Sequence, residues 1–387
     1  MATGNQKLIG AGFREWKRFL TVVFFIAGNA IGASVLGLPI AMREAGFIPA
    51  CTVCLFMSLV MAWAELLLAR MFMESGSSDL PGMFKSKLGH AGGVVFNCCY
   101  FILFFCLLVA YWTGTRAILN AFSLGSWSLW ATIFAVGCCL CLGFRVAGPL
   151  NTLLTTCMAL AFLYLGWETF ATAGGNFLGA MNFRAATAAL PIVVCSYCFH
   201  GAIPLICRQL NCDRKMIDAA IITGVVLPLM FNIAILFIGF RVLSPQELAE
   251  GAANGWPLFV ALENKLSSRV FFVTGNLFSI FAILSSLVGV TTTMKGALAD
   301  AINVGNKMLF PLEFAVILLL PLAIAILCPQ IFIGTLEFSG GILSNLMVGI
   351  LPALALIRGR IMDWKRSILL AIFLWIFGLE IIKLFTN

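Results

Sequence analysis

The chain has 387 residues, of which 61% are hydrophobic and only 10% are charged. A soluble globular domain carries about 25% charged residues, so this composition excludes a soluble enzyme or binding module and indicates a multi-pass membrane protein. The formal net charge of +8 does not indicate a nucleic-acid partner, because the basic residues lie in short loops between apolar runs.

A helix needs about 20 apolar residues to cross a bilayer, and the sequence contains eleven segments that approach this rule. These segments lie at residues 18–41, 47–72, 92–120, 127–144, 150–167, 187–207, 217–242, 270–294, 312–328, 338–357 and 367–385. Most of the 24 Lys and Arg residues fall on one side of these segments. By the positive-inside rule this bias predicts a cytoplasmic N-terminus and an external C-terminus.

The first segment is unusual between residues 24 and 41, FFIAGNAIGASVLGLPIA. Three glycines and a proline interrupt it, and each glycine costs a helix about 1 kcal/mol relative to alanine. Backbone groups freed inside a bilayer need partners, so a broken helix persists only within protein or beside a cavity. The interruption is therefore a candidate substrate site, and close helix packing through small residues is the alternative interpretation.

An odd number of segments permits an architecture of two five-helix repeats and one additional helix. Residues 18–167 would form a first repeat, residues 187–357 a second repeat of inverted topology, and residues 367–385 an additional helix. Secondary transporters use this architecture, with interrupted helices at equivalent positions of the two halves. The repeat therefore predicts a second break in the sixth segment, where Ser196, His200, Gly201 and Pro204 stand in mid-span.

Two motifs resemble a known family. Residues 28–33, GNAIGA, followed by Leu38 and Pro39, resemble the first-helix motif of the hydroxy and aromatic amino acid permeases. Residues 196–204, SYCFHGAIP, resemble the S-F-x-F-H-G-x-x-P stretch in that family's sixth helix. Tyr197 stands where a Phe is usual and Cys198 where Gly is frequent, which leaves the side-chain preference of the site open.

The resemblance is strongest to the tyrosine/tryptophan permease branch of the amino acid–polyamine–organocation superfamily. It implies an all-α integral protein of the bacterial inner membrane with the leucine-transporter-like fold, about eleven transmembrane helices and broken first and sixth helices. It also implies proton symport of tyrosine or tryptophan by alternating access around a midplane site. The implied partners are the amino acid, the coupling proton and the lipid bilayer, with no cofactor and no resident metal.

A zwitterionic substrate brings a carboxylate and an ammonium group into a low-dielectric site, where both charges need partners. Backbone amides at a half-helix N-terminus suit the carboxylate, and carbonyls at the opposite half-helix end suit the ammonium. An aromatic ring needs an apolar pocket, which residues of the third segment could line. The predicted substrate-binding residues are Gly28, Asn29, Gly32 and Ala33 in the first break, Ser196, Tyr197, Phe199 and Gly201 in the second, and Tyr100 and Phe104.

Membrane-buried ionisable residues are functional candidates. Glu65 either accepts hydrogen bonds from freed amides of the sixth segment or carries the coupled proton, and His200 is the second proton-coupling candidate. Coupling to sodium instead would use the hydroxyls of Ser285 and Ser286 with backbone carbonyls. The alternative function is thus a sodium-coupled carrier, or a carrier of another neutral amino acid such as serine or threonine. A membrane-embedded enzyme would need clustered His, Asp or Glu in the spans, and the sequence has only isolated ones.

Overall fold

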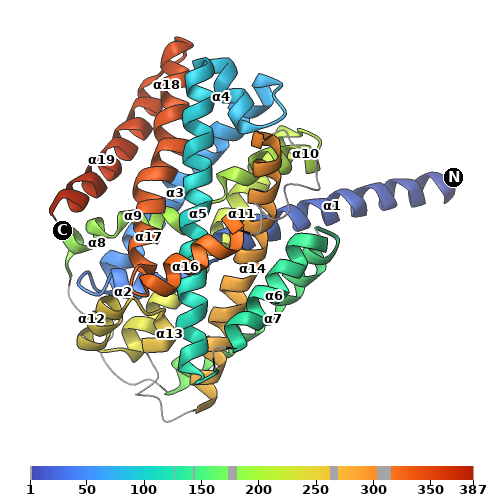
Figure 1. Cartoon of the computed structure of the whole chain (residues 1–387). Coiled ribbons are helices and arrows are strands. Elements are labelled where there is room, and N and C mark those ends of the chain that lie inside the picture. The colour runs from blue at the N-terminus through green and yellow to red at the C-terminus, as the bar shows by residue number, and fades with distance from the viewer. Residues whose placement is uncertain are drawn as a thin grey trace.

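The computed structural model describes residues 2–125, 127–142, 144–172, 181–261, 269–302 and 315–386 (Figure 1). Helices make up the regular structure of these residues, and none of them lies in a β-strand. The longest helices are α1 (Ala2–Ala30), α3 (Phe47–Ser75), α5 (His90–Ala121), α6 (Trp127–Leu142), α7 (Phe144–Thr172), α11 (Arg214–Val242), α14 (Arg269–Ile302) and α19 (Trp364–Thr386).

Shorter elements connect or interrupt these helices. They are α2 (Ala33–Ala41), α4 (Leu80–Leu88), α8 (Phe183–Ala188), α9 (Leu190–Cys195), η1 (His200–Ala202), α10 (Ile203–Gln209), α12 (Pro245–Asn254), α13 (Leu258–Ala261), η2 (Ala315–Leu319), α16 (Leu320–Leu327), α17 (Phe332–Phe338), η3 (Ser339–Ile350) and α18 (Leu351–Arg358). Among them η1 is a 3₁₀-helix, whereas η2 and η3 are π-helical.

Eight helices in the described part of the chain are long and apolar enough to cross a membrane, and the bent pair of α1 and α2 makes a ninth. Two further apolar helices, at Trp127–Cys138 and Ala315–Leu327, are shorter. Together these elements coincide with the eleven segments predicted from the sequence. Large apolar side chains such as Phe134, Leu163 and Phe170 lie on the outer surface, as expected for a lipid-facing bundle.

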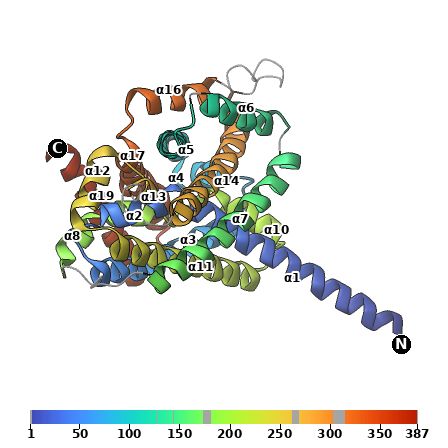
Figure 2. The same ribbon diagram turned by 90° about the horizontal axis from the view of Figure 1, so that it is seen from below.

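The bundle is organised around α5, which packs against α14, α16 and α17 (Figure 1). Figure 2 shows α5 end-on, with α16 on one side and α14 on the other. Gly114 of α5 makes this packing close, since a β-carbon there would lie 2.7 Å from Ile283 Cδ1 of α14 and 3.1 Å from Phe332 Cε2 of α17. The core thus positions α2, α9 and η3 in the interior, where most of their residues are buried.

Local chemistry explains several helix ends. Asp79 Oδ1 accepts the Gly82 amide at the start of α4, and Gly76, with φ of +63°, ends α3 in the left-handed conformation. Ser244 and Glu247 form a capping box at the start of α12. Helices α12 and α13 lie between α11 and α14 along the chain, and α12 packs on α2.

Candidate substrate site at two interrupted helices

The first break separates α1 from α2, whose axes differ by 47°. Ile31 and Gly32 lie outside both helices, and Gly32 precedes α2 without a side chain that caps its amides. A β-carbon on Gly32 would lie 2.9 Å from Ser286 Oγ and 3.4 Å from the Tyr111 hydroxyl. The break therefore faces α14 and α5, and a side chain at position 32 would displace the Ser286 hydroxyl.

The other predicted residues of the first break face different neighbours. Gly28 faces α7, where Thr155 Oγ1 lies 3.9 Å from its would-be β-carbon. The Asn29 side-chain amide donates to the Phe25 carbonyl at 2.9 Å, and Asn29 Oδ1 lies 3.6 Å from a β-carbon built on Gly289 of α14. Ala33 is the fully buried first residue of α2. The residues around this one kink thus face three helices, α5, α7 and α14.

The second break also occurs where it was predicted. Helix α9 ends at Cys195, residues 196–199 are not helical, and the chain resumes with η1 and α10. Ser196 Oγ donates to the Val193 carbonyl at 2.7 Å and accepts from Asn232 Nδ2 of α11 at 2.9 Å. The Tyr197 hydroxyl donates to the Cys54 carbonyl of α3 at 3.2 Å. These bonds hold the unwound segment to α11 and α3.

The structure brings Gly201 together with both predicted aromatic residues of α5. A β-carbon on Gly201 would lie 3.0 Å from Tyr100 Cε2 and 3.2 Å from Phe104 Cζ. The Tyr100 and Phe104 rings meet edge to face, with 4.4 Å between their centroids, and both residues are only partly buried. Phe199, next to this group along the chain, is buried. An apolar wall of aromatic rings therefore lies against the second break.

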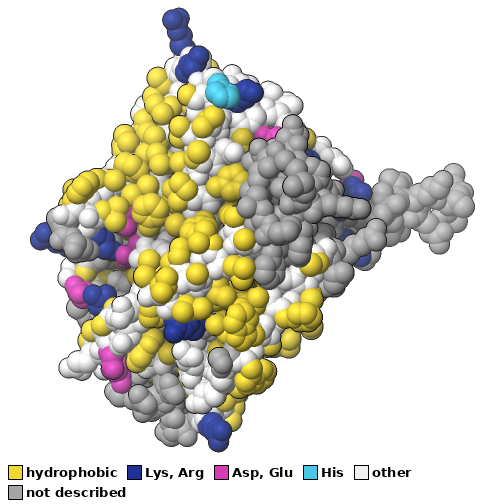
Figure 3. Space-filling model, in the orientation of Figure 1, with side chains coloured by type: hydrophobic (Ala, Val, Ile, Leu, Met, Phe, Trp, Pro, Cys, Tyr) yellow, Lys and Arg dark blue, Asp and Glu magenta, His cyan; other side chains and the backbone are white. Residues whose placement is uncertain are grey.

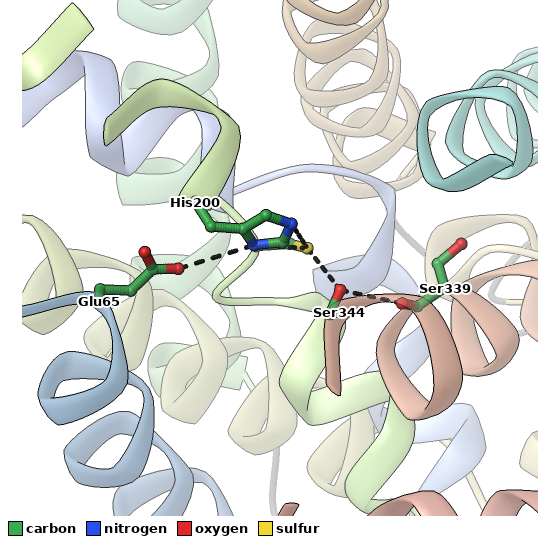
Figure 4. A network of polar contacts seen from close by, with 5 residues as sticks. Glu65, His200, Ser339 and Ser344 are labelled. Atoms are coloured by element: carbon green, nitrogen blue, oxygen red, sulfur yellow. Dashed lines mark hydrogen bonds and ion pairs between the residues drawn. The ribbon is translucent and has the colours of Figure 1, made fainter. Parts of the chain in front are cut away.

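A polar chain runs through the second break (Figure 4). His200 Nδ1 lies 3.7 Å from Glu65 Oε1 on one side and 3.7 Å from Cys198 Sγ on the other. The Glu65 and His200 side chains are 0% and 2% exposed. The 3.7 Å separation exceeds a hydrogen bond, so Glu65 and His200 are close buried neighbours that form an ion pair only when the imidazole is protonated. Neither carboxylate oxygen of Glu65 has a hydrogen-bond partner among the described residues, so the expected bonds to freed amides of the sixth segment are not formed there.

The chain of contacts continues into η3, which the sequence did not predict. Cys198 Sγ lies 2.8 Å from Ser344 Oγ, and this hydroxyl donates to the Ser339 carbonyl at 2.9 Å (Figure 4). In the sequence, the run Ser339-Gly340-Gly341 was the signal that could have indicated a close approach of this segment to another helix. A β-carbon on Gly340 would lie 1.8 Å from the Pro191 carbonyl oxygen, so η3 meets α9 backbone to backbone. Long π-helices are rare and often accompany functional sites.

The two serines suggested for sodium differ in their surroundings. Ser285 Oγ donates to the Ala282 carbonyl of its own helix at 3.0 Å. Ser286 Oγ has no hydrogen-bond partner among the described residues, and it faces Gly32 at the first break. Within the described ranges, no group of three or more His, Cys, Asp or Glu side chains is arranged to hold a metal ion.

Comparison with known proteins identifies the family. The model of the tryptophan/tyrosine permease family matches residues 15–371. The chain belongs to this family. The match confirms the resemblance found in the two motifs, and it establishes a multi-pass membrane protein of a transporter family.

Relatives of this permease carry several substrate names. It is 26% identical over 353 residues to a "Tryptophan-specific transport protein" of Shigella flexneri, covering 86% of this chain and 84% of that one. It is 24% identical to "Tyrosine-specific transport system 2" of Haemophilus influenzae, covering 81% and 82%. It is 23% identical to "Glutamine transporter 2" of Aliivibrio fischeri, covering 84% of both.

Solved structures confirm the leucine-transporter-like fold of the permease. A manganese transporter of Eremococcus coleocola superposes with a TM-score of 0.62 at 13% identity, over 95% of this chain and 87% of that one. MhsT in complex with L-phenylalanine superposes with a TM-score of 0.60 at 15% identity, over 92% and 98%. At these identities the likeness extends to the fold alone.

Proposed function

We propose that this permease imports an aromatic amino acid, tryptophan or tyrosine, by proton symport, with alternating access around the two interrupted helices. The observation that most directly supports this proposal is the contact of Gly201 in the second break with the Tyr100 and Phe104 rings. An aromatic side chain needs such an apolar surface next to the polar backbone that holds its amino acid group. The names of the tryptophan- and tyrosine-specific relatives support this substrate class.

In this proposal the amides of the first turn of α2 bind the substrate carboxylate. The first N–H groups of a helix lack intrahelical partners, and no side chain caps them at Gly32. The positive end of the α2 dipole favours an anion at the same place. The carbonyl end of α9, near Ser196, binds the ammonium group. Neither charge then needs an Arg or Lys, and neither break contains one.

Glu65 and His200 carry the coupled proton in this proposal. They are buried together, so a single proton added to or removed from the pair changes the net charge of an interior site. That change alters the cost of keeping the site closed, because a lone buried charge is unfavourable. His200 also touches Cys198, which contacts Ser344. Protonation of the pair can therefore bias the packing of the second break against η3.

We infer that residues 18–167 and 187–357 are the two inverted repeats, that residues 367–385 form the additional helix, and that the N-terminus is cytoplasmic. The matched positions of the two breaks support the repeat boundaries. The Lys and Arg bias of the loops supports the orientation. Rocking of one repeat element against the other would then expose the midplane site to each side in turn.

A second candidate is a sodium-coupled carrier, or a carrier of another neutral amino acid. The unpartnered hydroxyl of Ser286 beside Gly32 favours sodium coupling, because a hard cation prefers oxygen ligands and an interrupted helix offers carbonyls. The glutamine transporter among the relatives favours the broader substrate class.

Uptake into proteoliposomes separates these candidates. Labelled tryptophan and tyrosine are first offered with an inward proton gradient and no sodium. They are then offered with a sodium gradient and no proton gradient. Unlabelled glutamine and serine serve as competitors. The proposal expects accumulation driven by protons, abolished by a protonophore and inhibited only by aromatic amino acids. Uptake that requires sodium and is lost in Ser286→Ala contradicts proton coupling. Inhibition by glutamine equal to that by tyrosine contradicts the aromatic preference.

A further inference from the structure

A basic pocket lies where α3, α4 and α18 meet, and none of its lining residues belongs to the two breaks. Its volume is about 300 Å³, at the small end of the range of ligand sites, about 300–1,000 Å³. Met71 of α3, Lys87 of α4, and Ala355 and Arg358 of α18 line it, with Gly359 and Ile361 of the following loop. Two of these residues are cationic and none is acidic, so the pocket has the charge expected of an anion site.

The walls of the pocket are held in place. The Arg358 guanidinium donates to the Leu88 carbonyl at 2.8 Å, which ties the end of α18 to the end of α4. Beyond the pocket, Arg366 donates through its side chain to the Ile361 carbonyl and through its amide to Asp363 Oδ1. Asp363 also faces the Arg366 guanidinium at 3.8 Å. The Asp363 carboxylate is therefore engaged outside the pocket. The charged side chains of the pocket itself are those of Lys87 and Arg358.

The pocket lies at the level where the apolar helices begin and end. Helix α18 ends at Arg358, α19 begins at Trp364 and α5 begins at His90. Leu354, Ile357 and Ile361 are 45%, 48% and 49% exposed on or just beyond α18. Figure 3 shows this arrangement from outside, with basic side chains at the top of the molecule above the hydrophobic surface of α18 and α19.

We propose that this pocket binds the phosphodiester head group of an anionic phospholipid, whose acyl chains lie along the exposed apolar side chains of α18. Lys87 and Arg358 would pair with the charged head group. The acyl chains would pack on the apolar stripe formed by Leu354, Ile357 and Ile361. Basic pockets between transmembrane helices are the usual form of such lipid sites. A free phosphate ion shares the head-group chemistry but would gain nothing from the apolar stripe. The inference concerns the membrane partner and is independent of the proposed substrate.

The test titrates purified protein in detergent with dioleoylphosphatidylglycerol and follows the melting temperature. Dioleoylphosphatidylcholine and inorganic phosphate are the comparison ligands. Each basic residue contributes about fivefold to binding at an anionic lipid, so Lys87→Gln with Arg358→Gln should weaken the apparent lipid affinity about 25-fold. The matched control is Lys85→Gln with Arg360→Gln, which removes the same charge from the same helix end and loop but outside the pocket.

The expected result is stabilisation of the wild type by phosphatidylglycerol alone, retained in the control and lost in the pocket variant. Equal weakening in both double variants would overturn the proposal, because it would indicate diffuse attraction to the whole basic end. Equal stabilisation by inorganic phosphate would overturn it in favour of an ion site. Loss of the Arg358 bond to Leu88 could prevent folding of the pocket variant, and Ala355→Leu then serves in its place. This substitution fills the pocket and keeps both charges. Unchanged lipid affinity in Ala355→Leu would contradict the site.

Discussion

Gly340 of η3 lies directly against the backbone of α9, the helix that ends at the second break. In Gly340→Ala the new β-carbon would lie 1.8 Å from the Pro191 carbonyl oxygen and 2.7 Å from the Cys195 amide nitrogen. An ordinary contact begins at 3.4 Å, so the first distance is about 1.6 Å too short. Both opposing atoms belong to the α9 backbone and cannot rotate away. The substitution must therefore push η3 away from α9.

Overpacking of a well-filled interior costs about 1–3 kcal/mol, and a backbone clash of this depth belongs at the upper end of that range. We expect the free energy of unfolding of Gly340→Ala to fall by about 3 kcal/mol, measured as a lower melting temperature of the purified protein. The matched control is Gly378→Ala in α19, where a β-carbon meets no atom within 4 Å. There the helix should gain about 0.5–1 kcal/mol. A Gly340→Ala protein that melts at or above the wild-type temperature would refute the packing argument.

Three further substitutions test the roles assigned to single side chains. Tyr197→Phe removes the hydroxyl that donates to the Cys54 carbonyl and should lower stability by about 1 kcal/mol; a change in tryptophan-over-tyrosine preference at unchanged melting temperature would show that the hydroxyl faces substrate instead. Glu65→Gln removes the acid of the buried contact with His200 and should abolish proton-driven accumulation while exchange of labelled for unlabelled substrate continues; retained accumulation would exclude it as proton carrier. Asn29→Leu should abolish substrate uptake while the amount of protein in the membrane stays the same. Both quantities are measured, and normal uptake would exclude Asn29 from the substrate site.

The breaks could be predicted from the sequence because their causes are local. Gly32 lies in the first kink, and the polar Ser196 and Tyr197 begin the second unwound segment; such signals act within one turn of the chain. The hypothesis of an inverted repeat then predicted a second break to match the first. The sequence also supplied Tyr100 and Phe104 as aromatic candidates, but their contact with Gly201 depends on how α5 packs, which no local pattern contains.

The unpredicted features are those made by contacts between distant segments. Ser344 reaches Cys198 only because η3 is π-helical and lies directly on α9. Likewise, Lys383 of α19 pairs with Glu337 of α17, which lies 46 residues earlier in the chain. In both cases the geometry between two helices decides the partner, and spacing along one helix cannot reveal it.

In the proposed transport mechanism, the two breaks and the aromatic wall form the substrate site. The most direct test is equilibrium binding of labelled tryptophan to the purified protein, with Gly201→Leu compared with Gly334→Ala, whose new β-carbon meets no atom within 4 Å. A leucine at 201 would press on Tyr100 and Phe104, so we expect binding at least about tenfold weaker, equivalent to about 1.4 kcal/mol, and wild-type affinity in the control. Wild-type tryptophan affinity in a folded Gly201→Leu protein would contradict the claim.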